Sequence, residues 1–494
     1  MEARQLNNIS SLIGRALQGA GLAALLSAAI VNPWTGALYH DPIENYVDVL
    51  GGYMICALLF GVLLICGGTG IARTEKRPEV GLLLLAISGI VLLDRLLLAI
   101  IGLPYWVPDT DLHYRHRPNA DRVSIYRPQL AQRQPIKINS HGWHDDEFVT
   151  EKKAGEYRGL IVGDSIVMGW GVPQQAAFAN RLEQWLRQLG QSAQVINAGV
   201  EGYATTQERI VIEQGMIYSP DFIAVGFCMN DVNIPYVVDE RLGGIGFDHD
   251  IIASPSYWAG WVMNETGYGR AIQWWRSEQY LNTQHELVDE YDVKEMMVLP
   301  PDDPKFKAGW DITLQELERI YVLGKAHGLP VYLLIFPQTQ QLLREDLNAP
   351  QQTLKAHAKK YGAYPIDFTP LFNRALQVEV DKKLPQANAL PRPVFHAAVE
   401  VLSSIYYLDD VHFTREGHRF VASVLLQALT QYKHIEVDPI KARRFMVAST
   451  QGTALPYVPV PGTRAELEIK MEALKALGMG DQAEEIERMF NARR

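Results

Sequence analysis

Four short motifs in the sequence carry groups suited to attack on a carbonyl carbon. The first, Gly163-Asp164-Ser165, follows a short apolar stretch and precedes a pattern typical of a helix. A serine between a strand and a helix is well placed for nucleophilic attack, because the helix dipole and the free amides favour a developing negative charge. The tripeptide alone is a weak signal, since Gly, Asp and Ser are also common in turns.

The second and third motifs offer hydrogen-bond donors for an oxyanion. Asn197–Gly202 follows the next apolar stretch and ends in a glycine, whose backbone amide can approach a ligand closely. Asn230 follows a third apolar stretch that ends at Cys228, and a side-chain amide at the end of a strand can donate to an oxyanion. An ordinary turn at Gly202 and an Asx turn at Asn230 are the structural alternatives.

The fourth motif, Asp409-Asp410-Val411-His412, places an acid and a base on one loop. His412 would take the proton from Ser165, and Asp409 would hold the imidazole tautomer and stabilise the imidazolium. Asp410 is the rival acid, although a residue so close in sequence to the base aligns with it less easily.

These motifs follow elements that alternate between strand and helix. The apolar runs predict strands at 158–162, 194–197, 222–228 and 331–336. The helical periodicity predicts helices at 178–189, 205–216 and 312–327. Such alternation favours a parallel sheet with helices on both faces, and open sheets of this class bind ligands at the carboxyl ends of their strands.

In combination, the motifs resemble the SGNH/GDSL hydrolase family over roughly residues 155–432. The four blocks of that family correspond, in order, to Gly163–Ser165, Gly202, Asn230 and Asp409–His412. The resemblance implies a flavodoxin-like, three-layer α/β domain with serine esterase or acyl-transfer chemistry. Ser165 would be the nucleophile, His412 the base and then the acid, and Asp409 the orienting carboxylate. The amides of Ser165 and Gly202 and the side chain of Asn230 would stabilise the oxyanion, with no metal or other cofactor.

The first 107 residues are far more apolar than the rest and predict three transmembrane helices at about 12–31, 50–72 and 80–103. A cleaved signal peptide is the alternative for the first of them. Lys and Arg occur before the first span and at 73–77 but not between the first two spans. The positive-inside rule therefore predicts a multi-pass protein of the cytoplasmic (inner) membrane, with its catalytic domain on the outer, periplasmic side.

Asp94 and Arg95 lie within the third predicted span, where charges are costly and can mark a functional site. The favoured interpretation is that they contact neighbouring helices or oligomer partners.

The sequence thus predicts four consecutive segments. These are a membrane anchor at 1–107, an extended lead-in at 108–154, a hydrolase domain at 155–436 and a Pro-punctuated helical tail at 437–494. An aromatic-rich insertion is expected within the hydrolase domain at about 234–310, where its tryptophans either form a small core or stack on sugars or the membrane surface. In the tail, Thr463-x-x-Glu466 is a capping-box pattern, and Gly478 and Gly480 divide two short helices.

Composition excludes several classes of protein. The net charge is −10 and no long basic block occurs, which argues against nucleic-acid binding. Three cysteines argue against a disulfide scaffold. The pairs His113/His116 and His141/His144 are expected to be surface polar residues rather than metal ligands, because no cysteine or tight carboxylate set accompanies them.

We therefore expect a membrane-anchored serine esterase or O-acyltransferase. Its substrate would be an O-acyl ester on an envelope or secreted polysaccharide, with acetyl as the favoured acyl group. A lipid esterase or thioesterase is the alternative enzyme. A non-catalytic scaffold subunit of a polysaccharide export complex is the alternative without catalysis. The expected partners are a carbohydrate acyl ester, the membrane and other envelope-complex proteins, without nucleic acid.

Overall fold

The computed structural model describes residues 2–32, 47–74, 78–101, 103, 105–109, 111–126, 132–232, 262, 265–272, 300–304, 306–446 and 463–492. Two compact units are present. The first comprises residues 1–123 and 240–288, and the second comprises residues 124–239 and 289–494. Trp258, Trp261, Trp274 and Trp275 of the predicted insertion lie outside the described residues.

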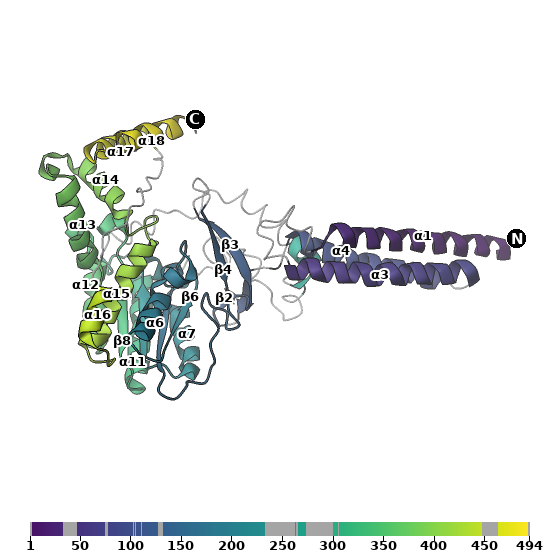
Figure 1. Cartoon of the computed structure of the whole chain (residues 1–494), viewed down its shortest axis with the longest axis horizontal. Coiled ribbons are helices and arrows are strands. Elements are labelled where there is room, and N and C mark those ends of the chain that lie inside the picture. Colours follow the sequence, from purple (N-terminus) through teal and green to yellow (C-terminus); the bar gives the residue numbers. More distant parts are fainter. Residues whose placement is uncertain are drawn as a thin grey trace. The chain divides into compact units, whose positions relative to one another are not determined.

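Three long helices, α1 (Glu2–Ile30), α3 (Val47–Thr74) and α4 (Pro78–Ile101), lie side by side in the first unit (Figure 1). Each contains an apolar stretch long enough to cross a membrane: Asn8–Ile30, Leu50–Ala72 and Glu79–Ile101. A methyl group on Gly68 would lie 2.5 Å from the Gly14 carbonyl oxygen, so only glycine permits this approach of α3 to α1. Large apolar side chains such as Leu59 remain 67% exposed, as expected of a surface that faces lipid.

The Asp94–Arg95 pair contacts a segment outside the three long helices. Arg95 donates to the Asp94 carboxylate, and the Tyr268 amide donates to the other Asp94 oxygen at 3.2 Å. Arg95 also reaches the Glu265 carbonyl at 3.5 Å, and Arg117 binds the Glu265 carboxylate through two contacts of 2.7 and 3.2 Å. Within the described residues, the charges on α4 therefore pair with each other and form hydrogen bonds with the largely helical segment at 265–272.

The lead-in contains paired strands. β1 (Trp106–Asp109) pairs antiparallel with β2 (His113–His116), and β3 (Asp121–Tyr126) and β4 (Gln132–Lys137) form a second two-stranded sheet.

The histidine prediction was wrong for His116 and His144, which are both buried. The His116 ring packs 4.8 Å from Tyr105, and His144 Nδ1 lies 3.2 Å from the Met168 carbonyl oxygen. Among the residues that the structure describes, no cluster of three potential metal ligands occurs.

A five-stranded parallel sheet forms the centre of the second unit. Its strands are β5 (Tyr157–Gly163), β6 (Ala193–Gly199), β7 (Phe222–Phe227), β8 (Val331–Ile335) and β9 (Tyr364–Asp367). Their spatial order is β6-β5-β7-β8-β9, the flavodoxin-like order with its switch point beside the first strand. The four predicted strands are confirmed, and β9 was missed.

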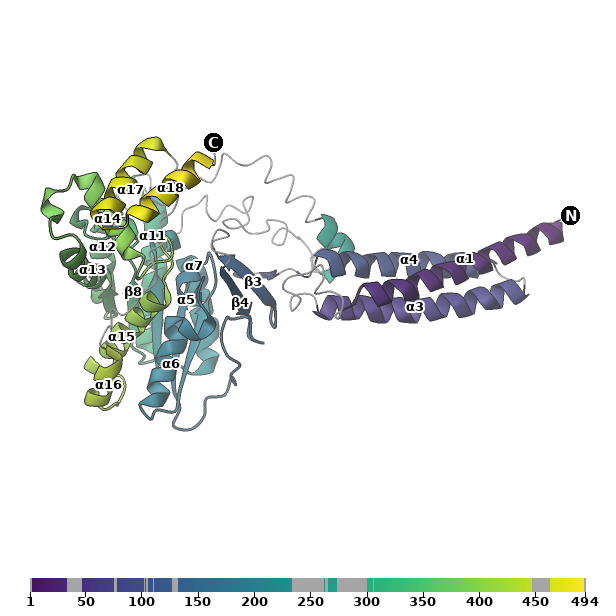
Figure 2. The ribbon, with the colours of Figure 1, turned by 45° about the horizontal axis from the view of Figure 1, so that its top comes forward.

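Helices cover both faces of this sheet (Figure 2). They are α5 (Ser165–Met168), α6 (Phe178–Gln188), α7 (Thr205–Gly215), α11 (Lys307–Ala326), α12 (Ala349–Lys360), α13 (Thr369–Lys383), α14 (Arg392–Ser403), α15 (Arg415–Gln431) and α16 (Pro439–Met446). Ile161 packs in a core cluster with side chains of α6 and α15, whereas the adjacent Leu160 lies against Gly215 of α7. Since successive strand residues face opposite sides, the domain has the expected three layers.

The structure describes the end of the predicted insertion and the helical part of the tail. Trp310 lies inside α11, is 1% exposed, and its ring centroid lies 6.2 Å from that of Phe227, so it belongs to the core of the second unit rather than to the insertion. The tail forms α17 (Arg464–Ala476) and α18 (Gly480–Ala492), which lie beside each other with α17 against α14 (Figure 2). The capping box of Thr463 and Glu466 is present at the start of α17.

Candidate active site

Ser165 lies at the junction between β5 and a helix. β5 ends at Gly163, and α5 begins at Ser165, so the Ser165 amide has no partner within the helix. Asp164 caps this helix by accepting a hydrogen bond from the Ile166 amide at 2.9 Å. Its second oxygen accepts from the side-chain amide of Asn230 at 2.9 Å. Asp164 therefore connects the first motif to the third.

Burial raises the pKa of Asp164, although its hydrogen bonds with Asn230 and Ile166 act in the opposite direction. The carboxyl group is only 1% exposed. Its two acceptor atoms are thus fixed by the protein before any substrate arrives.

The serine, histidine and aspartate of the first and fourth motifs form a continuous chain of hydrogen bonds. Ser165 Oγ lies 2.8 Å from His412 Nε2, and His412 Nδ1 lies 2.8 Å from Asp409 Oδ2. When Nδ1–H donates to Asp409, Nε2 is left to accept the hydroxyl proton of Ser165. This arrangement can activate the serine for attack on a carbonyl carbon.

A tight loop between α14 and α15 holds the acid and the base. Tyr407 and Phe413 form a β-bridge across it, and the Leu408 amide donates to the His412 carbonyl oxygen at 2.7 Å. The Tyr407 hydroxyl donates to the Pro337 carbonyl oxygen at 2.9 Å, which fixes the loop to the segment that follows β8.

The two candidate acids have different partners. Asp409 Oδ1 accepts the backbone amides of Val411 and His412 at 2.9 and 2.7 Å, and its other oxygen contacts the imidazole. Asp410 instead accepts a hydrogen bond from the Thr339 hydroxyl at 3.3 Å. The structure thus places Asp409, not Asp410, against His412.

The electrostatic surroundings favour the protonated form of His412. Burial lowers the pKa of His412, but the charge and hydrogen bond of Asp409, with smaller contributions from Asp164 and Glu201, raise it above its ordinary value overall. An imidazolium formed during catalysis would therefore be stabilised.

Gly202 and Asn230 occur at the carboxyl ends of the strands on either side of β5. After β6 the chain turns back, and the Val200 amide donates to the Gly163 carbonyl oxygen at 3.1 Å. Gly202 has a φ of 74°, a left-handed conformation that favours glycine. The Asn230 amide carries two N–H groups, and its contact with Asp164 uses one of them, so the second can serve a ligand.

The sequence interpretation missed an aromatic neighbour of the imidazole. The ring of Trp170 lies 6.4 Å from that of His412, and the Trp170 amide donates to the Ser165 carbonyl oxygen at 2.9 Å. Its position between Gly169 and Gly171, five residues after the serine, is the signal that could have revealed it.

Two further groups near the site are buried acids that the sequence interpretation did not identify. Glu208 and Asp231 are fully buried, and burial raises the pKa of both well above the ordinary value. The negative charge of Asp164 adds to this effect at Glu208, and the charges of Glu208 and Asp164 add to it at Asp231. Cys228 is also buried, and burial raises the pKa of its thiol, so a nucleophilic thiolate is disfavoured there.

A model of the GDSL-like lipase/acylhydrolase family matches residues 161–420. The chain belongs to this family. The match contains all four motifs, from Ser165 to His412, and identifies an enzyme that hydrolyses esters.

Solved structures similar to this chain include three hydrolases. An acetylxylan esterase from Geobacillus stearothermophilus is 14% identical, with 55% of this chain and 93% of that chain covered and a TM-score of 0.32. A second acetyl xylan esterase is 14% identical, covers 55% and 99% of the two chains, and has a TM-score of 0.33. An α/β hydrolase from the metagenome of Lake Arreo, Spain, is 14% identical, covers 56% and 95%, and has a TM-score of 0.30. No curated protein matches the chain.

Proposed function

We propose that Ser165, His412 and Asp409 are the catalytic triad of an O-acyl esterase or O-acyltransferase. The observation that carries this proposal is the chain of two 2.8 Å contacts from the Ser165 hydroxyl through the imidazole to the Asp409 carboxylate. His412 takes the hydroxyl proton as Ser165 Oγ bonds to the acyl carbon. It then gives that proton to the departing alcohol as the ester C–O bond breaks.

The acyl-enzyme formed in this step can be resolved by either of two acceptors. Water, deprotonated by His412, gives hydrolysis, and a sugar hydroxyl activated in the same way gives transfer. The tetrahedral intermediates carry a negative oxygen, for which the amides of Ser165 and Gly202 and the free N–H of Asn230 are the donors. Each such donor contributes on the order of 10²–10³-fold to kcat.

The proposed substrate is an acyl ester on an envelope or secreted polysaccharide, with acetyl as the favoured acyl group. Three helices long and apolar enough to cross a membrane support an integral membrane enzyme. The distribution of Lys and Arg around these helices supports a catalytic domain on the outer side of the cytoplasmic membrane. Trp170 beside His412 supports a carbohydrate, because an indole face is a good surface for a sugar ring.

The first test uses the full-length protein in detergent and a fluorophosphonate probe, with the labelled residue mapped by mass spectrometry. We expect labelling at Ser165 that is lost in Ser165→Ala and strongly reduced in His412→Ala. Either variant should lower kcat on an acyl ester by roughly 10⁴–10⁶-fold. Unchanged turnover in Ser165→Ala would sink the proposal, and the absence of labelling in folded protein would favour a scaffold role.

The second test identifies the substrate class. Acetate release from an acetylated polysaccharide is compared with fatty-acid release from phospholipid vesicles and with cleavage of an acyl thioester. Preference for the polysaccharide is expected. Preference for the lipid or the thioester would retain the triad and replace the proposed substrate.

A further inference from the structure

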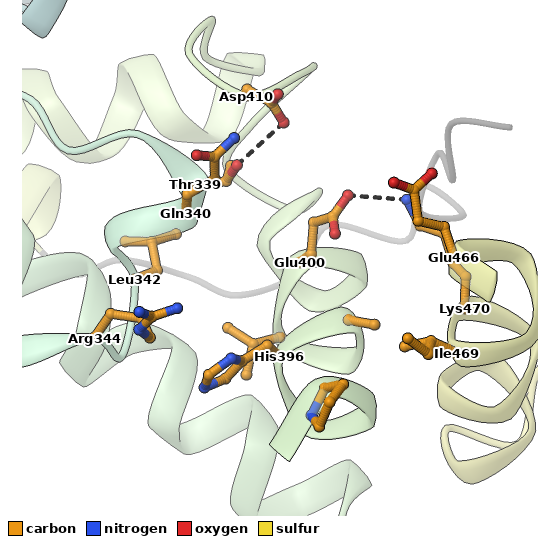
Figure 3. A pocket seen from close by; sticks show the side chains of 13 residues that line it. Thr339, Gln340, Leu342, Arg344, His396, Glu400, Asp410, Glu466, Ile469 and Lys470 are labelled. Atoms are coloured by element: carbon orange, nitrogen blue, oxygen red, sulfur yellow. Dashed lines mark hydrogen bonds and ion pairs between the residues drawn. The ribbon is translucent and has the colours of Figure 1, made fainter. Parts of the chain in front are cut away.

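A cleft of about 450 Å³, lined by both polar and apolar side chains, lies beside the catalytic loop, between α14, α17 and the short turn η7 (Thr339–Gln341) after β8 (Figure 3). Its size is within the range of small-molecule sites. One wall is formed by α17, which lies in the tail beyond residue 420, where the family match ends. The tail therefore adds a surface to the hydrolase domain that the family motifs do not include.

This cleft adjoins the proposed triad through Asp410. Asp410 lines the cleft and is two residues before His412, so the two Cα atoms are separated by at most roughly 7 Å. Thr339 also lines the cleft and binds Asp410 twice. Its hydroxyl donates to the Asp410 carboxylate at 3.3 Å (Figure 3), and its backbone amide donates to the Asp410 carbonyl oxygen at 2.9 Å. The cleft thus begins on the same loop that carries His412.

The cleft presents both donors and acceptors with almost balanced charge. Its lining includes three acids and two permanent bases, namely Glu400, Asp410, Glu466, Arg344 and Lys470. The remaining titratable group, His396, has a lowered pKa because of burial and the positive charges of Arg344 and Arg392, so it is mainly neutral at pH 7. Such a surface suits neither a strongly anionic nor a strongly cationic ligand. It suits a neutral molecule with many hydroxyl groups.

The wall of the cleft formed by α17 contains a charged pair in addition to the apolar contacts that attach the tail. α17 is attached by an apolar cluster that includes Leu467, Leu474 and Val401 of α14. Lys470 nevertheless contributes a side chain that is only 10% exposed and pairs with Glu400 at 2.9 Å (Figure 3). A partly desolvated ion pair is a costly way to hold a helix compared with an apolar contact. The pair gives this side of the cleft charged donor and acceptor groups.

We propose that this cleft binds a neutral sugar unit of the same polysaccharide chain whose ester reacts at Ser165. This inference rests on the proposed function and deepens it, because it makes the carboxyl-terminal helix α17 part of the substrate site. The enzyme would then recognise an oligosaccharide rather than an isolated acetylated sugar.

The test measures how the activity of the full-length protein depends on substrate length. Acetylated gluco-oligosaccharides of one to four units are compared with p-nitrophenyl acetate, which cannot reach the cleft. In the unmodified protein we expect kcat/KM to rise with length by about tenfold or more, equivalent to about 1.4 kcal/mol. Ala397→Phe, which fills the cleft from α14, should abolish this rise and lower the ratio of oligosaccharide to p-nitrophenyl acetate activity by the same factor.

Two further variants make the outcome decisive. Gln340→Ala removes a polar lining group without adding bulk, and it should reduce the length dependence in the same direction if Ala397→Phe does not fold. Ala326→Phe, at an exposed position in the last turn of α11, is the matched control and should retain the length dependence. Length dependence preserved in the cleft variants, or absent in the unmodified protein, overturns the inference. Failure of Ser165 labelling and of all ester hydrolysis would instead contradict the proposed function.

Discussion

At the scale of single residues, the imidazole of His412 is bound on both sides, by the Ser165 hydroxyl and by the Asp409 carboxylate. Asp409 is itself fixed by the backbone amides of Val411 and His412. The acid is therefore oriented by the same loop that carries the base. This explains how a residue only three positions away can align with the ring.

The first prediction concerns this acid. Asp409→Asn should lower kcat on an activated ester by roughly 10³–10⁴-fold, because an amide does not stabilise the imidazolium and favours the wrong tautomer. Steady-state kinetics on the full-length protein measure the effect. Asp311→Asn, at an exposed position that pairs with Lys307, is the control for loss of a carboxylate. A loss smaller than about tenfold would contradict the orienting role of Asp409.

The second prediction concerns pH. The base must be neutral to accept the Ser165 proton, and the surroundings raise the pKa of His412 above its ordinary value of about 6.5. Activity should therefore fall on the acid side with a midpoint above about 6.5.

Replacing Asp409 should move that midpoint downward. Asp409→Asn removes the largest group that raises the pKa of His412 and leaves the burial that lowers it. Profiles of kcat/KM between pH 5 and 9 for both proteins give the two midpoints. An upward shift, or none, would show that another group controls this part of the profile.

At the scale of elements, α7 brings a buried acid beneath the active-site edge of the sheet. Thr205 at the start of α7 donates to the Asp231 carbonyl oxygen at 3.0 Å, and Arg209 pairs with Glu316 of α11. Between these contacts Glu208 is 0% exposed, and neither of its carboxylate oxygens has a hydrogen-bond partner among the described residues. Burial and the negative charge of Asp164 raise the pKa of Glu208 well above its ordinary value.

The third prediction follows from that raised pKa. The folded state holds the Glu208 proton at pH values where the unfolded chain has lost it, so folding stability falls as pH rises above the unfolded value of about 4.3. Glu208→Gln removes this titration. Its stability relative to the unmodified protein should grow with pH between 5 and 8, by at most about 1.4 kcal/mol per pH unit.

Urea unfolding in one detergent at several pH values tests whether this difference in folding stability grows with pH. Glu213→Gln, on the exposed side of the same helix, is the matched control and should leave the pH dependence unchanged. A constant difference between Glu208→Gln and the unmodified protein would mean that Glu208 is ionised in the folded state.

The central strands were predictable because most of them contain a continuous apolar run. β5, β7 and β8 are buried along almost their whole length, which leaves an unambiguous pattern in the sequence. β9 has only four residues, all half-buried, and offers no comparable run. Its place in the sheet depends on pairing with β8, which is a tertiary contact that local sequence does not record.

At the active site, too, the features that the sequence could not predict depend on contacts that local sequence does not record. The four motifs could be placed at one edge of the sheet and Asp409 could be preferred to Asp410, but a linear pattern does not specify the loop hydrogen bonds that align Asp409 with His412. Likewise, Asp94 is compensated by the Tyr268 amide, a partner far away in the sequence. Predictions from sequence were thus reliable where burial is local and failed where partners are distant.

At the scale of the whole molecule, the proposed substrate requires a particular orientation in the membrane. A polysaccharide outside the cytoplasm can reach Ser165 only if an odd number of spans separates the amino terminus from the catalytic domain. The helices α1, α3 and α4 supply three apolar stretches of 23 residues. Arg4, before the apolar stretch of α1, and Lys76 and Arg77, after α3, favour a cytoplasmic amino terminus.

The fourth prediction tests this orientation with single cysteines. In a background with Cys56, Cys66 and Cys228 replaced by serine, Glu151→Cys places a thiol on the exposed surface of the second unit, and Gln5→Cys places one near the amino terminus. A membrane-impermeant maleimide should label Glu151→Cys in cells whose cytoplasmic membrane is intact. Gln5→Cys should react only after that membrane is permeabilised. The reverse pattern would place Ser165 in the cytoplasm and exclude an envelope polysaccharide as substrate, while the esterase chemistry of the triad would remain open to a cytoplasmic ester.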